Sequence, residues 1–229
     1  MDWGLILSNA LQASIGADMV IYCLAAIGLN VHFGYAGLLN FGQAAFVAVA
    51  AYGLATMVAT FGLSFWLGIS VGLVAVIVLA LLLGIPTLRL RADYLAIVTL
   101  AAAEIVRLTF RSVTLRDTFG GSDGLQGFAD GFYRLNPYTV GIDLGPISFS
   151  ARQSWGITVG WVLIILASLL VWALMRSPWG RVLKGIREDE DAVRSLGKNV
   201  YSYKLQALLI GGLIGALGGF MYALAQAAV

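Results

Sequence analysis

The 70 residues from position 19 to position 88 contain no lysine, arginine, aspartate or glutamate, and His32 is the only one of them that can become cationic. A helix needs about 20 mostly apolar residues to cross a bilayer, so this stretch alone is long enough for at least two membrane spans. Of the whole chain of 229 residues, 60% are apolar and 11% are charged, against about 25% charged in an average soluble domain. These values exclude a soluble enzyme, a nucleic-acid-binding protein and a disordered chain, and they indicate a polytopic membrane protein.

Six membrane spans can be drawn along the chain. Only helices and closed barrels satisfy every backbone polar group in lipid, and these segments lack the strict alternation of barrel strands. We therefore expect an all-α, polytopic transmembrane helical bundle that forms a single domain over residues 1–229. The predicted spans cover residues 8–30, 40–60, 64–85, 94–111, 155–175 and 205–227.

The distribution of basic residues predicts which side of the membrane each loop faces. Residues 176–204 contain seven of the 14 lysines and arginines, and Arg89 and Arg91 lie just before the fourth span. The loop 112–154 holds three arginines against four aspartates. Because basic residues are enriched in cytoplasmic loops, we expect 86–93 and 176–204 inside the cell. The loop 112–154 and the N-terminus are then outside, and the turn-rich outer loop is expected to hold a short hairpin or an interfacial helix.

A glycine-rich, uncharged segment lies between the first two spans, at residues 34–43. Its composition favours irregular backbone at membrane depth, which is tolerated only against protein or a watery cavity. Broken helices of this kind line substrate paths in transporters, although a tight connection between two helices would have the same composition. The residues that we expect on a translocation path are Gly34, Tyr35, Gly37, Asn40, Phe41 and Gln43.

Two carboxylates fall inside the predicted spans. Glu104 lies ten residues past the start of the fourth span, about 15 Å along the helix axis, and we also place it on the path. Arg107, at i+3, is its expected partner because an unpaired carboxylate in lipid is expensive. The pair is either a structural link between helices or part of a gate. Asp18 either faces the bundle interior or, if the helix begins there, caps the helix at the interface.

Glycines and isolated polar residues complete the inventory of the spans. Gly211, Gly215 and Gly219 form two overlapping small-xxx-small repeats, which predict a close helix-packing face. We expect His32 at a helix end near the cytoplasm and Cys23 as a small buried residue. Neither belongs to a catalytic or metal-ligand grouping in the sequence, so we expect neither a membrane-embedded enzyme nor a metal site.

The predicted cytoplasmic loop contains the pattern of a short amphipathic helix. Pro178 ends the fifth span, residues 188–191 give an acidic start that favours the helix dipole, and Gly197 is placed to end the helix. Between them, an apolar stripe is formed by Ala192, Val193 and Leu196. Such a helix suits the docking of a partner, although a helix held at the membrane surface by its basic residues would show the same pattern.

Residues 191–197 resemble the EAA-x-x-x-G cytoplasmic motif of permeases of ATP-binding-cassette (ABC) importers, with Asp191 in place of glutamate and Val193 in place of the second alanine. Further segments, in the same order along the chain, resemble branched-chain amino acid permeases of the LivM type. These segments are 34–46, 88–100, 104–108, 120–125 and 177–181. Family members usually continue with several more helices, so the resemblance also suggests a fragment, a truncated product or one half of a split permease. The loop 128–152 is longer than expected.

The resemblance implies a division of labour. A periplasmic or extracellular binding protein would deliver a branched-chain amino acid to a plasma-membrane path that this chain forms with a second, LivH-type permease subunit. Two ATPase subunits would bind ATP and push on the helix that contains Glu188, Asp191, Ala192 and Gly197. This chain would hold no cofactor itself, and it has no phosphate-binding G-x-x-x-x-G-K-[ST] motif. The alternative is an ion-coupled secondary transporter of small amino acids or of amides such as urea, in which Asp18 or Glu104 carries protons or ions.

Overall fold

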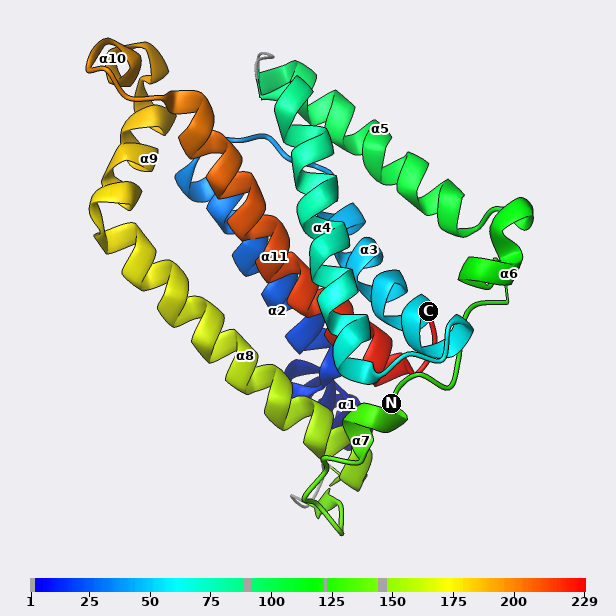
Figure 1. Ribbon diagram of the computed structural model, residues 1–229. Coiled ribbons are helices and arrows are strands. Elements are labelled where there is room, and N and C mark those ends of the chain that lie inside the picture. Colours follow the sequence, from blue (N-terminus) through cyan, green and yellow to red (C-terminus); the bar gives the residue numbers. More distant parts are fainter. Residues whose placement is uncertain (1–2, 89–91, 122, 144–147) are drawn as a thin grey trace.

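The computed structural model describes residues 3–88, 92–121, 123–143 and 148–229, most of them in helices (Figure 1). The helices are α1 (Trp3–Ile15), α2 (Ala17–Asn30), α3 (Gln43–Ala55), α4 (Phe65–Thr87), α5 (Ala92–Phe110), α6 (Arg116–Phe119), α7 (Asp130–Tyr133), α8 (Ala151–Arg176), α9 (Pro178–Glu188), α10 (Glu190–Ser195) and α11 (Val200–Gln226). Two π turns, Val31–Tyr35 and Thr56–Thr60, continue α2 and α3, and a 3-10 turn covers Val113–Leu115. Two short strands, β1 (Ile142–Asp143) and β2 (Ser148–Phe149), pair antiparallel.

Five helical segments of the described chain are long and apolar enough to cross a membrane. They are Ala17–Tyr35, Gln43–Thr60, Phe65–Thr87, Ala151–Arg176 and Val200–Gln226. The predicted all-α, multi-pass bundle is therefore confirmed. The remaining predicted span, 94–111, is also helical, but α5 carries Asp93, Glu104 and Arg107 within its 19 residues, which sets it apart from the five apolar segments.

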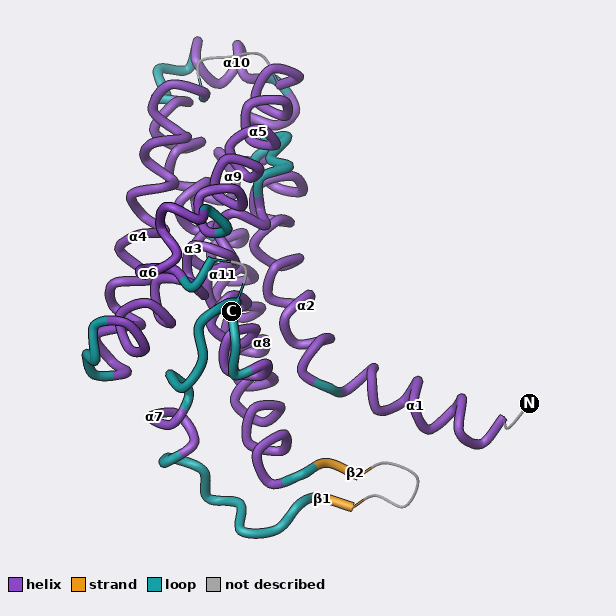
Figure 2. The backbone as a smooth tube through the Cα atoms, turned by 90° about the vertical axis from the view of Figure 1, so that its right-hand side faces the viewer, coloured by secondary structure: helices purple, strands orange, loops and turns teal. Residues whose placement is uncertain are grey.

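The predicted first span, 8–30, is not one helix. Gly16 has an extended backbone that separates α1 from α2, and α1 leaves the bundle at an angle (Figure 2). The crossing segment begins at Ala17 instead. Asp18 lies exposed in the first turn of α2, where a carboxylate favours the positive end of the helix dipole. The alternative that buries Asp18 in the bundle is therefore wrong.

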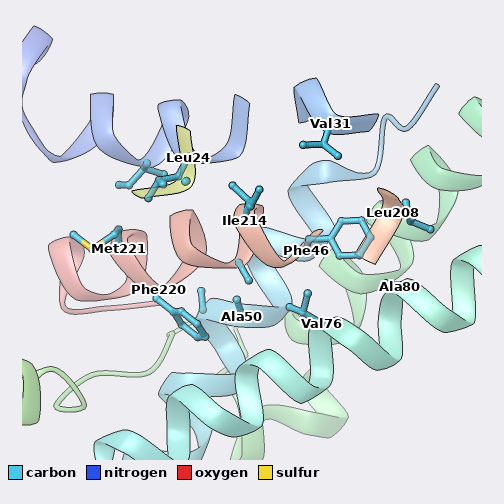
Figure 3. Packing of buried hydrophobic residues seen from close by; sticks show 14 of the residues in the cluster. Leu24, Val31, Phe46, Ala50, Val76, Ala80, Leu208, Ile214, Phe220 and Met221 are labelled. Atoms are coloured by element: carbon cyan, nitrogen blue, oxygen red, sulfur yellow. The ribbon is translucent and has the colours of Figure 1, made fainter. Parts of the chain in front are cut away.

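The centre of the bundle is α11, which packs against α2, α3, α4 and α8 and has most of its residues buried. Figure 1 shows it running between α4 and α8. The core around it is formed by large apolar side chains from several helices (Figure 3). They include Leu24 of α2, Phe46 of α3, Val76 of α4, and Leu208 and Phe220 of α11.

Three glycines lie where α11 approaches its neighbours most closely. A Cβ atom added to Gly211 would lie 2.5 Å from the carbonyl oxygen of Gly28 on α2. A Cβ on Gly215 would lie 2.3 Å from the side-chain nitrogen of Gln43, and one on Gly219 would lie 2.2 Å from a backbone oxygen of α3. The backbone oxygens that face Gly211 and Gly219 cannot move without the helices, so only glycine fits at these two positions and this face of α11 sets the helix spacing.

The loop 112–154 holds both kinds of structure that the sequence left open, the β1–β2 hairpin and the short helices α6 and α7. Ile142 pairs with Phe149 across the hairpin. The loop also covers the end of α11, because the Tyr133 hydroxyl donates a hydrogen bond to the Leu224 carbonyl at 2.8 Å. This loop and α10 lie at opposite ends of the bundle (Figures 1 and 2).

Arg89 and Arg91, which were used to predict the topology, lie outside the described residues, as do residues 122 and 144–147 of the outer loop. The end of α4 and the start of α5, on either side of residues 89–91, lie at the same end of the bundle as α10 (Figure 1). This placement agrees with putting 86–93 and 176–204 on one side of the membrane.

Candidate functional site

The chain between α2 and α3 leaves regular helix at the segment predicted to be irregular. A π turn covers Val31–Tyr35, and regular α-helix resumes at Gln43. Gly37, in the connection, has φ +67°, a conformation that favours glycine. A π turn inserts an extra residue into the helix and is frequent at functional sites.

We call this interruption, residues 31–42, the break after α2, and a buried chain of hydrogen bonds holds it to α11. His32 is fully buried, with Nε2 3.1 Å from the Leu208 carbonyl oxygen and Nδ1 3.0 Å from the Asn40 amide nitrogen. A carbonyl can only accept, so Nε2 carries the proton and Nδ1 accepts from Asn40. The Asn40 oxygen in turn accepts from the Gly42 backbone N–H at 2.8 Å. His32, which the sequence placed only at a helix end, therefore fixes the geometry of the break.

The start of α3 is tied to three other helices. The Phe41 backbone N–H donates to the Thr99 hydroxyl of α5 at 3.1 Å. The Gln43 side-chain nitrogen donates to the carbonyls of Ala25 on α2, at 3.4 Å, and Gly211 on α11, at 3.3 Å. The Gln43 oxygen is buried, and no described atom donates a hydrogen bond to it.

Two hollows flank α3, and we call them together the α3 groove. The hollow between α2 and α3 has a volume of about 620 Å³ and an apolar lining, with Gln43 and three tyrosines as its polar residues. The hollow between α3 and α5 has a volume of about 540 Å³ and includes Glu104, Arg107 and Arg111 in its lining. Both hollows share Ala44, Ala48 and Tyr52 of α3.

The ion pair predicted in the fourth span lines this groove. Arg107 donates to both Glu104 carboxylate oxygens, at 2.8 and 2.6 Å. Both side chains are about half exposed and both belong to α5, so the pair does not connect α5 to another helix of this chain. No group of three or more His, Cys, Asp or Glu side chains in the described part of the chain is arranged to hold a metal ion.

The predicted cytoplasmic loop contains a helix that the sequence analysis missed. Pro178 does end α8, but it also occupies the first turn of α9, and the Ser177 hydroxyl caps that turn by accepting from the Gly180 N–H. Proline suits this position because its missing N–H would have no partner inside the helix. Leu183 and Ile186 are buried against the bundle, while the basic residues of α9 are exposed.

The short helix predicted from the acidic start is α10. Asp189 caps it, accepting from the Ala192 N–H at 2.9 Å, and Glu190 pairs with Arg194 at 2.8 Å. Glu190 also pairs with Lys204 of α11, which ties α10 to the bundle. Gly197, with φ +76°, follows the end of the helix.

Within this region, Glu188 and Val193 differ from the expected pattern or orientation. Glu188 is the last residue of α9 and lies outside α10, and it pairs with Arg187 at 2.6 Å. Val193 is turned toward Gly185 of α9 and is only partly exposed. The outer surface of α10 is formed by Asp191, Ala192, Ser195 and Leu196, of which Leu196 is 78% exposed.

The predicted path residues divide between two places. Gln43 and Glu104 line the α3 groove, on opposite sides of α3, whereas Asn40 is buried against His32. Phe41 is exposed, with its ring 5.6 Å from that of Phe33.

The other three predicted path residues, Gly34, Tyr35 and Gly37, lie against α9. The Arg187 guanidinium donates to the Gly34 carbonyl, and the Lys184 ammonium lies 5.9 Å from the centre of the Tyr35 ring. The structure therefore brings the break after α2 into contact with the loop 176–204, a pairing that the sequence analysis did not predict.

Comparison with known proteins shows that the sequence of this chain is similar to transport permeases. A family model described as "Branched-chain amino acid transport system / permease component" matches residues 13–229. The chain is 32% identical to the high-affinity branched-chain amino acid transport system permease protein LivM of Salmonella typhimurium, over 98% of this chain and 55% of that protein. The Escherichia coli protein of the same name gives the same identity and coverage.

A probable branched-chain amino acid transport permease protein LivM of Methanocaldococcus jannaschii is 27% identical, over 89% of this chain and 64% of that protein. The chain thus spans about half the length of the two bacterial relatives. No solved structure matches it significantly.

Proposed function

Because the chain belongs to the family of branched-chain amino acid transport system permease components, we propose that it is a permease subunit of an ABC importer. It is a multi-pass protein of the plasma membrane. In this proposal it forms part of the path for a branched-chain amino acid and couples that path to separate ATPase subunits. A second permease subunit and a substrate-binding protein outside the membrane complete the system, and ATP is bound by the ATPases.

The observation that carries the proposal is α10. It is a capped, six-residue helix between two membrane spans, and Ala192 and Leu196 are exposed on its outer surface. Glu190 and Asp191 both pair with Arg194, which presets the helix before any partner binds. A short exposed helix that is preset and apolar at one edge supports a docking role.

The α3 groove supports the path. Its lining is largely apolar, with few polar groups, as is usual for sites that accept a small molecule with an apolar body. Both hollows are open to the outside of this chain, so a second permease subunit would close them. Leucine, isoleucine and valine have side chains that suit such a lining, and the names of the relatives give the same substrate class.

Co-purification tests the docking role. The tagged chain is expressed with the other components of its transport system, extracted in mild detergent, and analysed for bound ATPase, and uptake is measured in proteoliposomes. We expect Asp191→Lys to reduce both, because it reverses a charge on the docking surface and breaks the pair with Arg194. The matched control is Asp117→Lys, which reverses an exposed acidic charge in the loop at the other end of the bundle.

Equal ATPase binding and uptake in both variants would contradict the docking role of α10. Uptake that continues without any ATPase and follows an ion gradient would instead favour the secondary-transporter alternative.

A further inference from the structure

The contact between α9 and the end of α2 joins two parts of the molecule that have separate roles in the proposed function. We call it the α9–α2 contact, formed by Lys184 and Arg187 on α9 and by Gly34, Tyr35 and Gly37 beyond α2. The Arg187 side chain also passes close over Gly37, where an added Cβ would lie 3.0 Å from the Arg187 Cγ. Glycine at Gly37 therefore provides both the left-handed backbone and the space for the arginine.

Electrostatics favour this contact. The last carbonyls of a helix have no partner within the helix and carry partial negative charge. Arg187 supplies a charged donor to one of them, the Gly34 carbonyl, and Lys184 adds a second cation nearby. The competing partner of Arg187 is Glu188, the adjacent residue on the surface, and an exposed pair of that kind holds its members weakly.

On the loop side, α9 is connected to the docking helix. Val193 of α10 packs at Gly185 of α9, and only Asp189 separates the two helices. Glu190 of α10 also pairs with Lys204 at the start of α11. A force on α10 therefore reaches α9 through a short and well-packed connection.

On the membrane side, the break after α2 is connected to the walls of the α3 groove. His32 and Asn40 carry the hydrogen-bond chain from the π turn to the Gly42 N–H, directly before α3. Phe41 carries a second bond to Thr99 of α5. A displacement at Gly34 therefore acts on α3 and α5, the two helices that flank the hollow containing Glu104.

We propose that Arg187, through its hydrogen bond to the Gly34 carbonyl and its packing on Gly37, is the positioning residue that transmits movement of the docking helix to the α3 groove. The inference rests on the proposed function, since it assumes an ATPase that acts on α10. It adds a specific residue and route: α10 to α9, Arg187 to the break after α2, and the break to α3 and α5.

The test is performed on the complete transporter in proteoliposomes, with substrate uptake and ATP hydrolysis measured in the same vesicles. Arg187→Gln removes the charge and shortens the side chain. We expect a roughly tenfold fall in substrate moved per ATP hydrolysed, the size of effect that one charged hydrogen bond can produce, with the ATPase still bound. Arg187→Lys keeps a cation within reach and should lose less.

Arg181→Gln is the matched control. Arg181 is an exposed arginine of the same helix, and its hydrogen bond, at 3.5 Å, goes to the nearby Arg176 carbonyl at the end of α8. This variant makes the same change in charge, and it should keep the normal ratio of substrate to ATP.

A covalent link provides a second readout if Arg187→Gln weakens assembly. Cys23 is the only cysteine, so in a Cys23→Ala background the pair Tyr35→Cys and Lys184→Cys can be joined by a thiol cross-linker. The Lys184 ammonium lies 5.9 Å from the Tyr35 ring, so the two side chains approach each other, and reagents of increasing length are used because the cysteine sulfurs lie nearer the backbone. With Arg187 present, we expect cross-linking to leave transport intact. When Arg187→Gln is added, we expect cross-linking to restore the amount of substrate moved per ATP hydrolysed.

Two results would overturn the inference. One is an unchanged ratio of substrate to ATP in Arg187→Gln. The other is transport that stops on cross-linking with Arg187 present, which would mean that the contact must break during the cycle. Failure of the proposed function would look different, because the unmodified chain would then show no ATP-driven uptake at all.

Discussion

Gly211 offers the most stringent test of the packing described above, because the smallest possible side chain there has no space. In Gly211→Ala, the added Cβ would lie 2.3 Å from the His32 Nε2 and 2.5 Å from the Gly28 carbonyl oxygen. His32 cannot move aside freely, since it is fully buried and bonded to both Leu208 and Asn40. Either α11 must shift away from α2, or the imidazole must give up its hydrogen bonds.

The free-energy cost of the substitution follows from these two responses, the shift of α11 and the loss of the His32 hydrogen bonds. Overpacking of a close-packed core costs about 1–3 kcal/mol, and each buried hydrogen bond that is lost adds about 1 kcal/mol. We therefore expect Gly211→Ala to lower the free energy of unfolding by about 2–5 kcal/mol. The control is Gly156→Ala on α8, where nothing lies within 4 Å of the added Cβ. Alanine there should be neutral or stabilising by up to about 1 kcal/mol.

The single cysteine of the chain provides the assay. Cys23 is partly buried on α2, so its reaction with a thiol-reactive fluorophore in detergent reports unfolding as the temperature rises. The unfolding midpoint of Gly211→Ala should fall well below that of the unmodified protein, and that of Gly156→Ala should not. Equal midpoints for the two variants would refute the packing argument.

Two further predictions concern the α3 groove and the outer loop. Glu104→Gln should leave the unfolding midpoint nearly unchanged, because the pair with Arg107 is half exposed and lies within one helix. The same variant should reduce uptake in proteoliposomes. A loss of uptake that only follows a loss of folded protein would contradict a role in the groove. Burial raises the pKa of the Tyr133 hydroxyl above its ordinary value, against the opposing effect of the Arg152 charge, so the fold favours the neutral form. The contribution of neutral Tyr133 to stability is present below about pH 10 and is lost as the pH rises through the pKa of the folded state. The unfolding midpoint should therefore fall less steeply with rising alkaline pH in Tyr133→Phe than in the unmodified protein.

The helical bundle could be predicted from sequence because its main determinant is local. Long apolar segments must be helical in lipid, whatever they pack against, and the approximate positions of four of the five apolar spans follow from that requirement. The break at Gly16 could not be predicted in the same way. Glycine is common within membrane helices, and nothing in the apolar sequence around Gly16 distinguishes a break from a continuous turn.

The hydrogen bonds of the candidate site were harder to predict because their partners are distant or lack a sequence signature. His32 bonds to the backbone carbonyl of Leu208, which lies 176 residues away and could belong to any residue type. Arg187 likewise bonds to the carbonyl of Gly34, 153 residues away. The capping of α10 by Asp189, in contrast, joins residues three apart, and the acidic start that indicated this helix is local as well.

The position of α11 also determines the order in which the molecule can assemble. Helices α2, α3, α4 and α8 all precede α11 in the chain, and each packs against it. They are therefore synthesised before the helix that fills the space among them. Until α11 arrives, the amide of Gln43 and the imidazole of His32 lack their partners at Gly211 and Leu208. The polar contacts at Gly211 and Leu208 can therefore form only when α11, the last of these five helices in the chain, has packed among the other four.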